Sequence, residues 1–161
     1  EPTDIAVVYP GDTRERYLGG ATYITIAVGD AMTLRDGCIV MALSAAGGWT
    51  ADPSSDRHQS TAEQFALRAE EMARRMVRSQ GNLRSWSNSY VPKVIMERKP
   101  VFLCCDGFTD AEARRLGFAG AYRQMDEALA AAGERIGRPQ GSISVSFPRG
   151  IQWRMMPRVD D

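Results

Sequence analysis

The sequence predicts an α/β domain with three layers, α/β/α, built on a mainly parallel sheet of four to five strands. Three short apolar runs support this fold class, at residues 4–9, 38–43 and 101–105. Each run is continuous rather than alternating, as expected for strands buried on both faces. Segments with helical periodicity separate the runs, and strands that alternate with helices are typical of parallel sheets covered by helices.

The segments between the strands have recognisable helix ends. A helix is predicted from Ser60, where Glu63 completes a capping box, to Gly81. Another is expected to begin at Asp12 and to end before Gly37. Its inward positions are predicted to be Tyr17, Ala21, Ile24 and Val28.

Three further helices are expected in the second half of the chain. Thr109 and Glu112 have the spacing of a capping box at the start of a short helix. Apolar residues at helical spacing predict a helix over residues 125–136. Residues 86–98 are expected to be helical in part, because Pro92 restricts where a helix can run.

Two features do not follow the main pattern. The run at residues 142–147 alternates serine with apolar residues, which predicts a peripheral strand with one solvated face. The pair Gly19-Gly20 lies inside a predicted helix, where it indicates close approach of another backbone or a break. The tail at residues 148–161 is too apolar for a free tail, so it is expected to pack on the domain or on a partner.

Composition limits the domain count and the function classes. The 161 residues have room for one domain, 1–161, and 43% are hydrophobic, as in globular proteins. Lys plus Arg and Asp plus Glu number 20 each, so no net basic field attracts nucleic acid or an anionic membrane. No apolar stretch is long enough to span a bilayer. We therefore expect neither nucleic acid nor membrane as a partner.

The metal-ligating residue types are few. The chain has one His, and its three cysteines, Cys38, Cys104 and Cys105, match no zinc spacing. An odd number of cysteines argues against a secreted disulfide framework and favours a reduced, cytoplasmic setting. The sequence predicts no metal site in this chain, and cysteines inside a strand are expected to be inert.

Candidate binding residues follow the strands, because ligands of open α/β sheets bind beyond the carboxyl ends of the strands. These ends are residues 10–12, the stretch 44–59 and residues 106–107. The stretch 44–59 is long for a connection, which is typical of a binding loop or a lid. In that interpretation Trp49 forms an apolar wall and His58 or Arg57 a polar contact. The alternative is a surface loop whose histidine is merely solvated, and Asp106 is expected to form a turn or a cap.

No complete catalytic set is recognisable. The sequence contains no dinucleotide fingerprint, no phosphate loop and no nucleophile elbow. Only His58 and displaced carboxylates could act near neutral pH. A complete enzyme therefore has to borrow groups from another domain or subunit.

Several blocks of the sequence resemble, in order and spacing, the carboxyl-terminal domain of the nickel-dependent lactate racemase family. They include a strand, a Gly-terminated turn, a second strand and a Gly-rich loop, then a strand and a short helix ending in Leu-Gly. The blocks lie at residues 4–8, 34–41, 44–48, 99–103, 108–118 and 125–129, with Ile143, Pro148 and Gly150 completing them. The resemblance covers nearly the whole chain.

The resemblance implies a two-domain enzyme that racemises or epimerises 2-hydroxy acids by hydride removal and return. In that family the amino-terminal domain carries the nickel-pincer nucleotide on a lysine, together with a catalytic histidine pair. The carboxyl-terminal domain closes the cleft and contacts the substrate. Residues 1–161 would then be this second domain of a longer chain. It would bind no cofactor by itself, and its partners would be the amino-terminal domain of the same protein and a small 2-hydroxy acid.

The resemblance also assigns the site and exposes one departure. Family members carry a substrate-contacting lysine on the first helix, and no lysine stands there in this sequence. Arg14 or Arg16 could supply the charge and would hold a carboxylate bidentately. The substrate-binding residues are accordingly predicted to be Gly11, Asp12, Arg14, Tyr23, Ser44, Gly47, Gly48 and Trp49, with His58 as a further candidate. No catalytic residue other than His58 is expected in this chain.

Two other hypotheses remain open at this point. The chain could be a non-catalytic α/β binding or interaction module, because similarity of fold alone does not establish function. It could also be a small enzyme that acts through His58 and an acid such as Asp56.

Overall fold

The structure, a computed structural model, describes residues 1–11, 16–49, 61–78, 83–146 and 152–155. Within these ranges six strands form one sheet in the order β4-β3-β2-β1-β5-β6. The first five are parallel, and β6 runs antiparallel to β5. The strands are β1 (Thr3–Val8), β2 (Thr33–Ala42), β3 (Val101–Cys104), β4 (Gly120–Tyr122), β5 (Ile143–Ser146) and β6 (Gln152–Met155).

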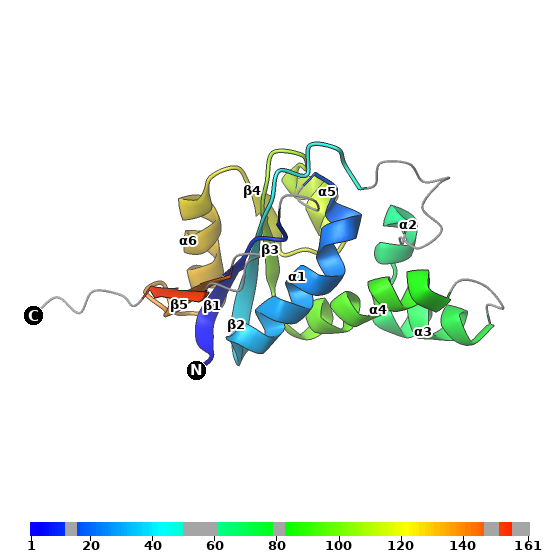
Figure 1. The fold of residues 1–161 in the computed structure, drawn as a ribbon, viewed down its shortest axis with the longest axis horizontal. Coiled ribbons are helices and arrows are strands. Elements are labelled where there is room, and N and C mark those ends of the chain that lie inside the picture. Colours follow the sequence, from blue (N-terminus) through cyan, green and yellow to red (C-terminus); the bar gives the residue numbers. More distant parts are fainter. Residues whose placement is uncertain (12–15, 50–60, 79–82, 147–151, 156–161) are drawn as a thin grey trace, which may run out of the picture.

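Helices cover both faces of this sheet, which confirms the three-layer α/β/α fold. Figure 1 shows α6 (Met125–Arg135) on one side of the sheet. On the other side lie α1 (Leu18–Met32), α4 (Leu83–Arg98) and α5 (Asp110–Arg115). The two remaining helices, α2 (Ala62–Phe65) and α3 (Ala69–Arg78), pack beside α4 and farther from the sheet.

The continuous apolar runs are explained by these two helical layers. Along β1, Ala6 and Val8 point into the larger core cluster, which α1, α4 and α5 close. Ile5 and Val7 point the other way, into a smaller cluster completed by α6. Because successive side chains of a strand point to opposite faces, a strand covered on both sides needs apolar residues at every position.

The sheet differs from the prediction at its two sides. Residues 142–147 were predicted to form a peripheral strand, but β5 lies between β1 and β6 and is not at the edge. The strand that covers it comes from the tail, so at residues 152–155 the tail packs on the domain as expected. At the opposite side, β4 is an additional strand that has only three residues.

The predicted helix from Ser60 to Gly81 is two helices in the described residues. The first, α2, has a capping box one residue later than predicted, made by Thr61 and Gln64. The Gln64 N–H donates to Thr61 Oγ1 at 3.1 Å, and the Thr61 N–H donates to Gln64 Oε1 at 3.0 Å. The second, α3, begins at Ala69, whose N–H donates to Glu97 Oε1 at 2.9 Å. By contrast, the capping box of Thr109 and Glu112 is present as predicted.

Helix α1 is rotated relative to the prediction. It ends at Met32, so Gly37 lies within β2 rather than at a helix end. Ile24, predicted to face inward, is 44% exposed, whereas Thr25 and Ile26 are buried. The only charged residue of α1 is Asp30, and a helix without a polar face gives the sequence no signal for its orientation.

Helix α4 runs through Pro92, although a proline inside a helix removes a hydrogen bond at a cost of about 3 kcal/mol. Packing offsets this cost, because Ile95 is buried in the larger core cluster. The end of α4 is tied to α1 through Asp30, which pairs with Arg98 and lies 2.9 Å from Lys99 Nζ. No helix in the described part of the chain is both long and apolar enough to cross a membrane.

Candidate functional site

Four connections meet at the carboxyl edge of the parallel strands, which lies at the top of Figure 1. They follow β1 at Tyr9–Gly11, β2 at residues 43–49, β3 at residues 105–109 and β4 at Arg123. Ligands of open α/β sheets bind at this edge. The connections from β1 to β4 cross one face, whereas α6 crosses the other face to reach β5, so the topology reverses between β1 and β5. Gly11 stands beside this reversal.

Residues 43–49 are held by backbone hydrogen bonds to the start of α1. The Gly47 N–H donates to Arg16 O at 2.9 Å, and the N–H groups of Leu18 and Gly19 donate to Gly48 O at 3.0 Å and to Trp49 O at 2.8 Å. The first N–H groups of a helix otherwise lack partners and attract anions. Here loop carbonyls occupy two of them, so those two groups are not open to a substrate carboxylate.

This contact explains Gly19. A Cβ at Gly19 would lie 2.7 Å from the Trp49 indole nitrogen and 2.8 Å from Trp49 O. The glycine pair in α1 is predicted to mark either close approach of another backbone or a break, and the structure shows close approach at Gly19.

The same loop is held on its other side by the connection after β3. The Gly107 N–H donates to Ser44 O at 3.2 Å, and a Cβ at Gly107 would lie 1.9 Å from Ala45 O. Ala45 itself has a φ of 50°, in the left-handed region that most residues avoid. The loop is therefore fixed between α1 and the β3 connection over residues 44–49. It is not a freely exposed loop in that part.

Four of the predicted binding residues lie at the carboxyl edge. Gly11 is buried and has a φ of 93°. Ser44 accepts the Ala46 N–H on its Oγ at 3.2 Å, Gly47 packs against the ring of Tyr17, and Gly48 has a φ of 77°. The edge brings these residues together as a backbone framework, and their role in binding stays a prediction.

The other predicted residues are placed differently. Trp49 is 9% exposed, and its ring centroid lies 4.9 Å from that of Phe65 in the core. Only a small part of that ring is open to a ligand. Tyr23 is 40% exposed in the second turn of α1, away from the helix start that contacts the loop. Asp12, Arg14 and His58 lie outside the described residues, as do Asp56 and Arg57.

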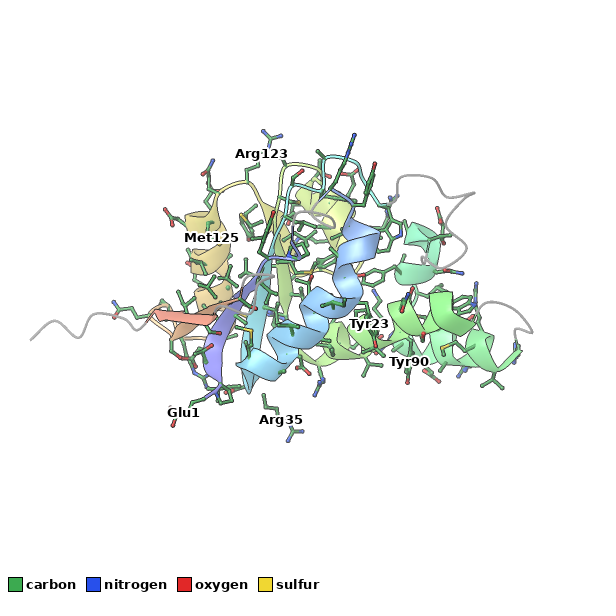
Figure 2. The ribbon with its side chains drawn as sticks, viewed as in Figure 1. Glu1, Tyr23, Arg35, Tyr90, Arg123 and Met125 are labelled. Carbon is green, nitrogen blue, oxygen red and sulfur yellow. The ribbon has the colours of Figure 1, made fainter. Side chains whose placement is uncertain are left out.

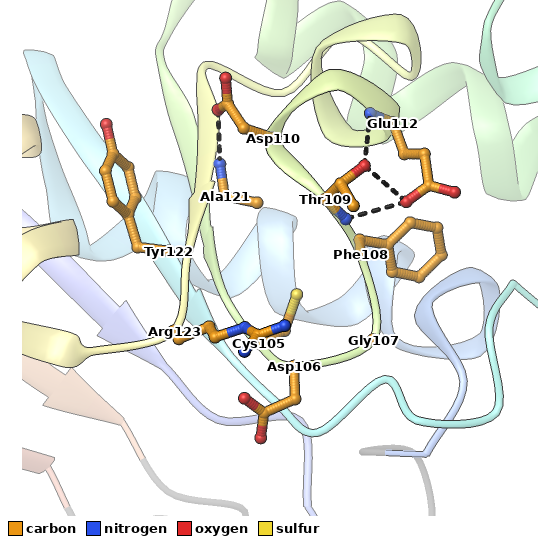
Figure 3. A pocket seen from close by; sticks show the side chains of 10 residues that line it. All are labelled: Cys105, Asp106, Gly107, Phe108, Thr109, Asp110, Glu112, Ala121, Tyr122 and Arg123. Carbon is orange, nitrogen blue, oxygen red and sulfur yellow. Dashed lines mark hydrogen bonds between the residues drawn. The ribbon is translucent and has the colours of Figure 1, made fainter.

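A pocket of about 240 Å³, which no sequence pattern predicts, opens at this edge between the connections after β3 and β4. Figure 3 shows its lining, which comprises Cys105, Asp106, Gly107, Phe108, Thr109, Asp110, Glu112, Ala121, Tyr122 and Arg123. Asp106 was identified at a strand end but was assigned to a turn. Arg123 follows β4, whose three residues form no apolar run, so no sequence signal placed it at the carboxyl edge.

The three cysteines are poor nucleophiles; Cys104 and Cys105 lie at this edge, and Cys38 lies within β2. Burial raises the pKa of Cys104 and of Cys105, and it raises the pKa of Cys38 to about 12. Since the thiolate is the reactive form, these thiols stay protonated and unreactive at neutral pH. This agrees with the expectation of inert strand cysteines.

The described residues do not fit a lysine-bound metal cofactor. The chain has two lysines, and both are buried and bonded. Lys93 Nζ donates to Leu116 O at 2.7 Å, and Lys99 Nζ donates to Thr33 Oγ1 at 2.6 Å. In the described ranges no three His, Cys, Asp or Glu side chains gather as a metal site. We therefore derive no step of a reaction through a nickel-pincer nucleotide on this chain.

No protein-family model and no curated protein matches the sequence. Among solved structures, the chain is similar to the lactate racemase apoprotein from Thermoanaerobacterium thermosaccharolyticum, with a TM-score of 0.71 and 16% sequence identity. The match covers 90% of this chain and 34% of that chain. At this identity the likeness establishes the fold. The chain thus has the fold of a portion of a lactate racemase and spans about a third of that protein's length.

Proposed function

We propose that this chain is the cleft-closing, substrate-contacting domain of an enzyme that racemises or epimerises 2-hydroxy acids. The observation that supports this most is the structural match, which includes 90% of the chain but only 34% of the lactate racemase. A domain of that relative size leaves room for a second, amino-terminal domain of the same protein. In this proposal, that domain carries the nickel-pincer nucleotide and the catalytic histidines.

The substrate-contacting groups of this chain come from the carboxyl edge of the sheet. Gly11, Ser44, Gly47 and Gly48 form the cleft wall, and their small size lets the other domain approach the backbone closely. Asp12 and Arg14 follow the β1 turn in sequence, beside the topological reversal where ligands of such sheets bind. Arg14 holds the carboxylate in place of the lysine that the family carries.

The domain contributes orientation and exclusion of water rather than a reacting group. Removing hydride from C2 of a hydroxy acid, with loss of its hydroxyl proton to a base, leaves a 2-keto acid, and returning the hydride to the other face and the proton to the oxygen inverts the centre. Solvent must not reach the hydride carrier meanwhile, and a closed cleft provides this. Trp49 supports the wall from the core by holding the loop against Phe65.

Racemisation by the full-length protein tests the proposal directly. The protein that contains this sequence is loaded with the nickel-pincer nucleotide and incubated with one enantiomer of lactate and of longer 2-hydroxy acids. Chiral chromatography then follows the appearance of the other enantiomer. We expect racemisation of at least one acid by the full-length protein and none by residues 1–161 alone.

Matched variants test the role of the edge. Arg14→Gln should raise KM about tenfold or more, as expected for loss of a charged hydrogen bond. Arg35→Gln, at the amino end of β2, should leave KM unchanged. Turnover by the isolated chain would contradict the proposal. A folded, cofactor-loaded full-length protein that racemises none of the acids would favour the non-catalytic binding module.

A further inference from the structure

The pocket between the β3 and β4 connections contains two charged side chains that the fold does not use. Its other acids are committed: Asp110 Oδ1 accepts the Ala121 N–H at 3.1 Å, and Glu112 Oε2 accepts the Thr109 N–H at 2.8 Å. For the side chains of Asp106 and Arg123, by contrast, the described part of the chain provides no hydrogen bond or ion pair; the Arg123 carbonyl accepts from Cys104 Sγ at 3.9 Å. Both are exposed. They are the lining charges that remain for a ligand.

These two residues line the pocket from neighbouring connections. Asp106 belongs to the turn after β3, and Arg123 directly follows β4, the strand beside it. Figure 3 shows the Arg123 side chain extending from its own connection toward the turn at Cys105 and Asp106. A guanidinium group presents a planar pair of donors that matches a carboxylate, and a carboxylate such as that of Asp106 accepts a hydroxyl proton.

The size and lining of the pocket restrict the ligand further. A volume of about 240 Å³ is below the range of pockets that hold drug-sized molecules. Cys105 is buried, and Phe108 and Ala121 are partly buried, so an apolar lining lies beside the two charges. The lining suits a short aliphatic chain, and the charges suit a carboxylate with a neighbouring hydrogen-bond donor.

We propose that this pocket binds a small 2-hydroxy acid, with its carboxylate on Arg123 and its hydroxyl group donating to Asp106. The choice of a hydroxyl group over another donor rests on the proposed function. Recognition of the carboxylate rests on the pocket itself.

This position is separate from the turn at Gly11. Gly11 follows β1 and Arg123 follows β4, and these strands are three positions apart in the sheet. At a spacing of about 4.8 Å per strand the two positions are about 14 Å apart. A short hydroxy acid is smaller than that distance and cannot contact both. The pocket is therefore separate from the predicted contact at Gly11, and it adjoins the loop at Ser44, because the Gly107 N–H donates to Ser44 O at 3.2 Å.

Amide chemical shifts of the ¹⁵N-labelled chain test the inference. We expect D- or L-lactate to shift the signals of Asp106, Gly107 and Arg123 saturably, with a Kd of about 1 mM. Arg123→Gln should weaken this binding about tenfold or more. Arg35→Gln is the matched control, because Arg35 is exposed at the far end of the molecule (Figure 2) and should leave the binding unchanged.

Two comparisons test the hydroxyl contact. Propionate, which lacks the hydroxyl group, should bind more weakly than lactate, and Asp106→Asn should reduce that preference. Alanine carries an ammonium group instead, and tighter binding of alanine than of lactate would overturn the assignment to a hydroxy acid. Absence of saturable shifts up to about 0.1 M lactate would overturn the site. The site would also be overturned by lactate-induced shifts that persist unchanged in Arg123→Gln, or by shifts that lie only around Gly11.

The outcome is independent of the racemase assay. Binding at Arg123 without racemisation by the full-length protein would retain the pocket and remove the proposed function. Racemisation without binding at Arg123 would retain the proposed function and remove the pocket as a binding site.

Discussion

Replacing Lys93 by methionine should remove a pH dependence of folding stability that this buried ammonium group imposes. Lys93 is 5% exposed, its Nζ donates to Leu116 O at 2.7 Å, and it lies 5.0 Å from the centre of the Phe65 ring. Burial lowers the pKa of Lys93 to about 8, and the charge of Glu97 opposes that shift only in part. The fold therefore disfavours the charged form of this side chain.

The sign follows from proton binding in the two states. An unfolded lysine has a pKa of about 10.4, so between about pH 8 and that value the unfolded chain binds more protons than the folded chain. The free energy of unfolding then rises with pH. With a folded pKa of about 8, linkage gives a gain of about 1 kcal/mol between pH 7 and pH 9. Below the folded pKa, the full free-energy cost of burying the charged Lys93 ammonium group is present.

Urea unfolding at pH 7, 8 and 9 measures this gain as a difference between the parent chain and Lys93→Met. The raised pKa of Cys38 lowers stability as the pH rises above about 9, but it does so in both proteins and cancels. Lys99→Met is the control, because Lys99 is buried beside a carboxylate, with its Nζ 2.9 Å from Asp30. We expect that variant to be destabilised, because it leaves the Asp30 carboxylate without the Lys99 ammonium group. A difference for Lys93→Met that stays constant from pH 7 to 9 would refute the reasoning.

Two further substitutions test the packing, with urea unfolding as the measurement. Gly107→Ala places a Cβ 1.9 Å from Ala45 O and should lower the free energy of unfolding by at least about 2 kcal/mol. The control Gly137→Ala, at a φ of 68° with open space around it, should lower it by about 1 kcal/mol. Equal losses of stability in the two variants would contradict the close contact at Gly107. Phe65→Ala removes a fully buried ring that lies between two other aromatic rings and should lower the free energy of unfolding by about 3–5 kcal/mol. The control Val77→Ala, at a site 89% exposed, should change stability little. A loss below about 1 kcal/mol for Phe65→Ala would show that the core refills the space.

The parts of the fold that the sequence predicted are those with a strong local signal. The three continuous apolar runs became β1, β2 and β3, because burial on both faces leaves a pattern in the residues themselves. The capping box at Thr109 is likewise local, since its partners are three residues apart. Strand β4 has only three residues, which are too few to form an apolar run. Its position is set by pairing with β3, which is distant in the sequence.

The candidate site was predictable only as a location. Topology places strand ends at one edge, so Gly11 and Ser44 could be assigned there from the sequence. The packing of Trp49 on Phe65 could not be assigned, because it depends on how residues distant in sequence meet. The same holds for Arg123, whose place in the pocket depends on the pairing of a three-residue strand.

The bonds that fix the loop after β2 also decide how this chain can take part in closing a cleft. Swinging residues 44–49 outward would break three backbone hydrogen bonds to the start of α1 and a fourth to Gly107, at a net cost of about 1 kcal/mol each. In the proposed cleft closure, this edge would therefore move as one rigid body, and the hinge would lie outside residues 44–49.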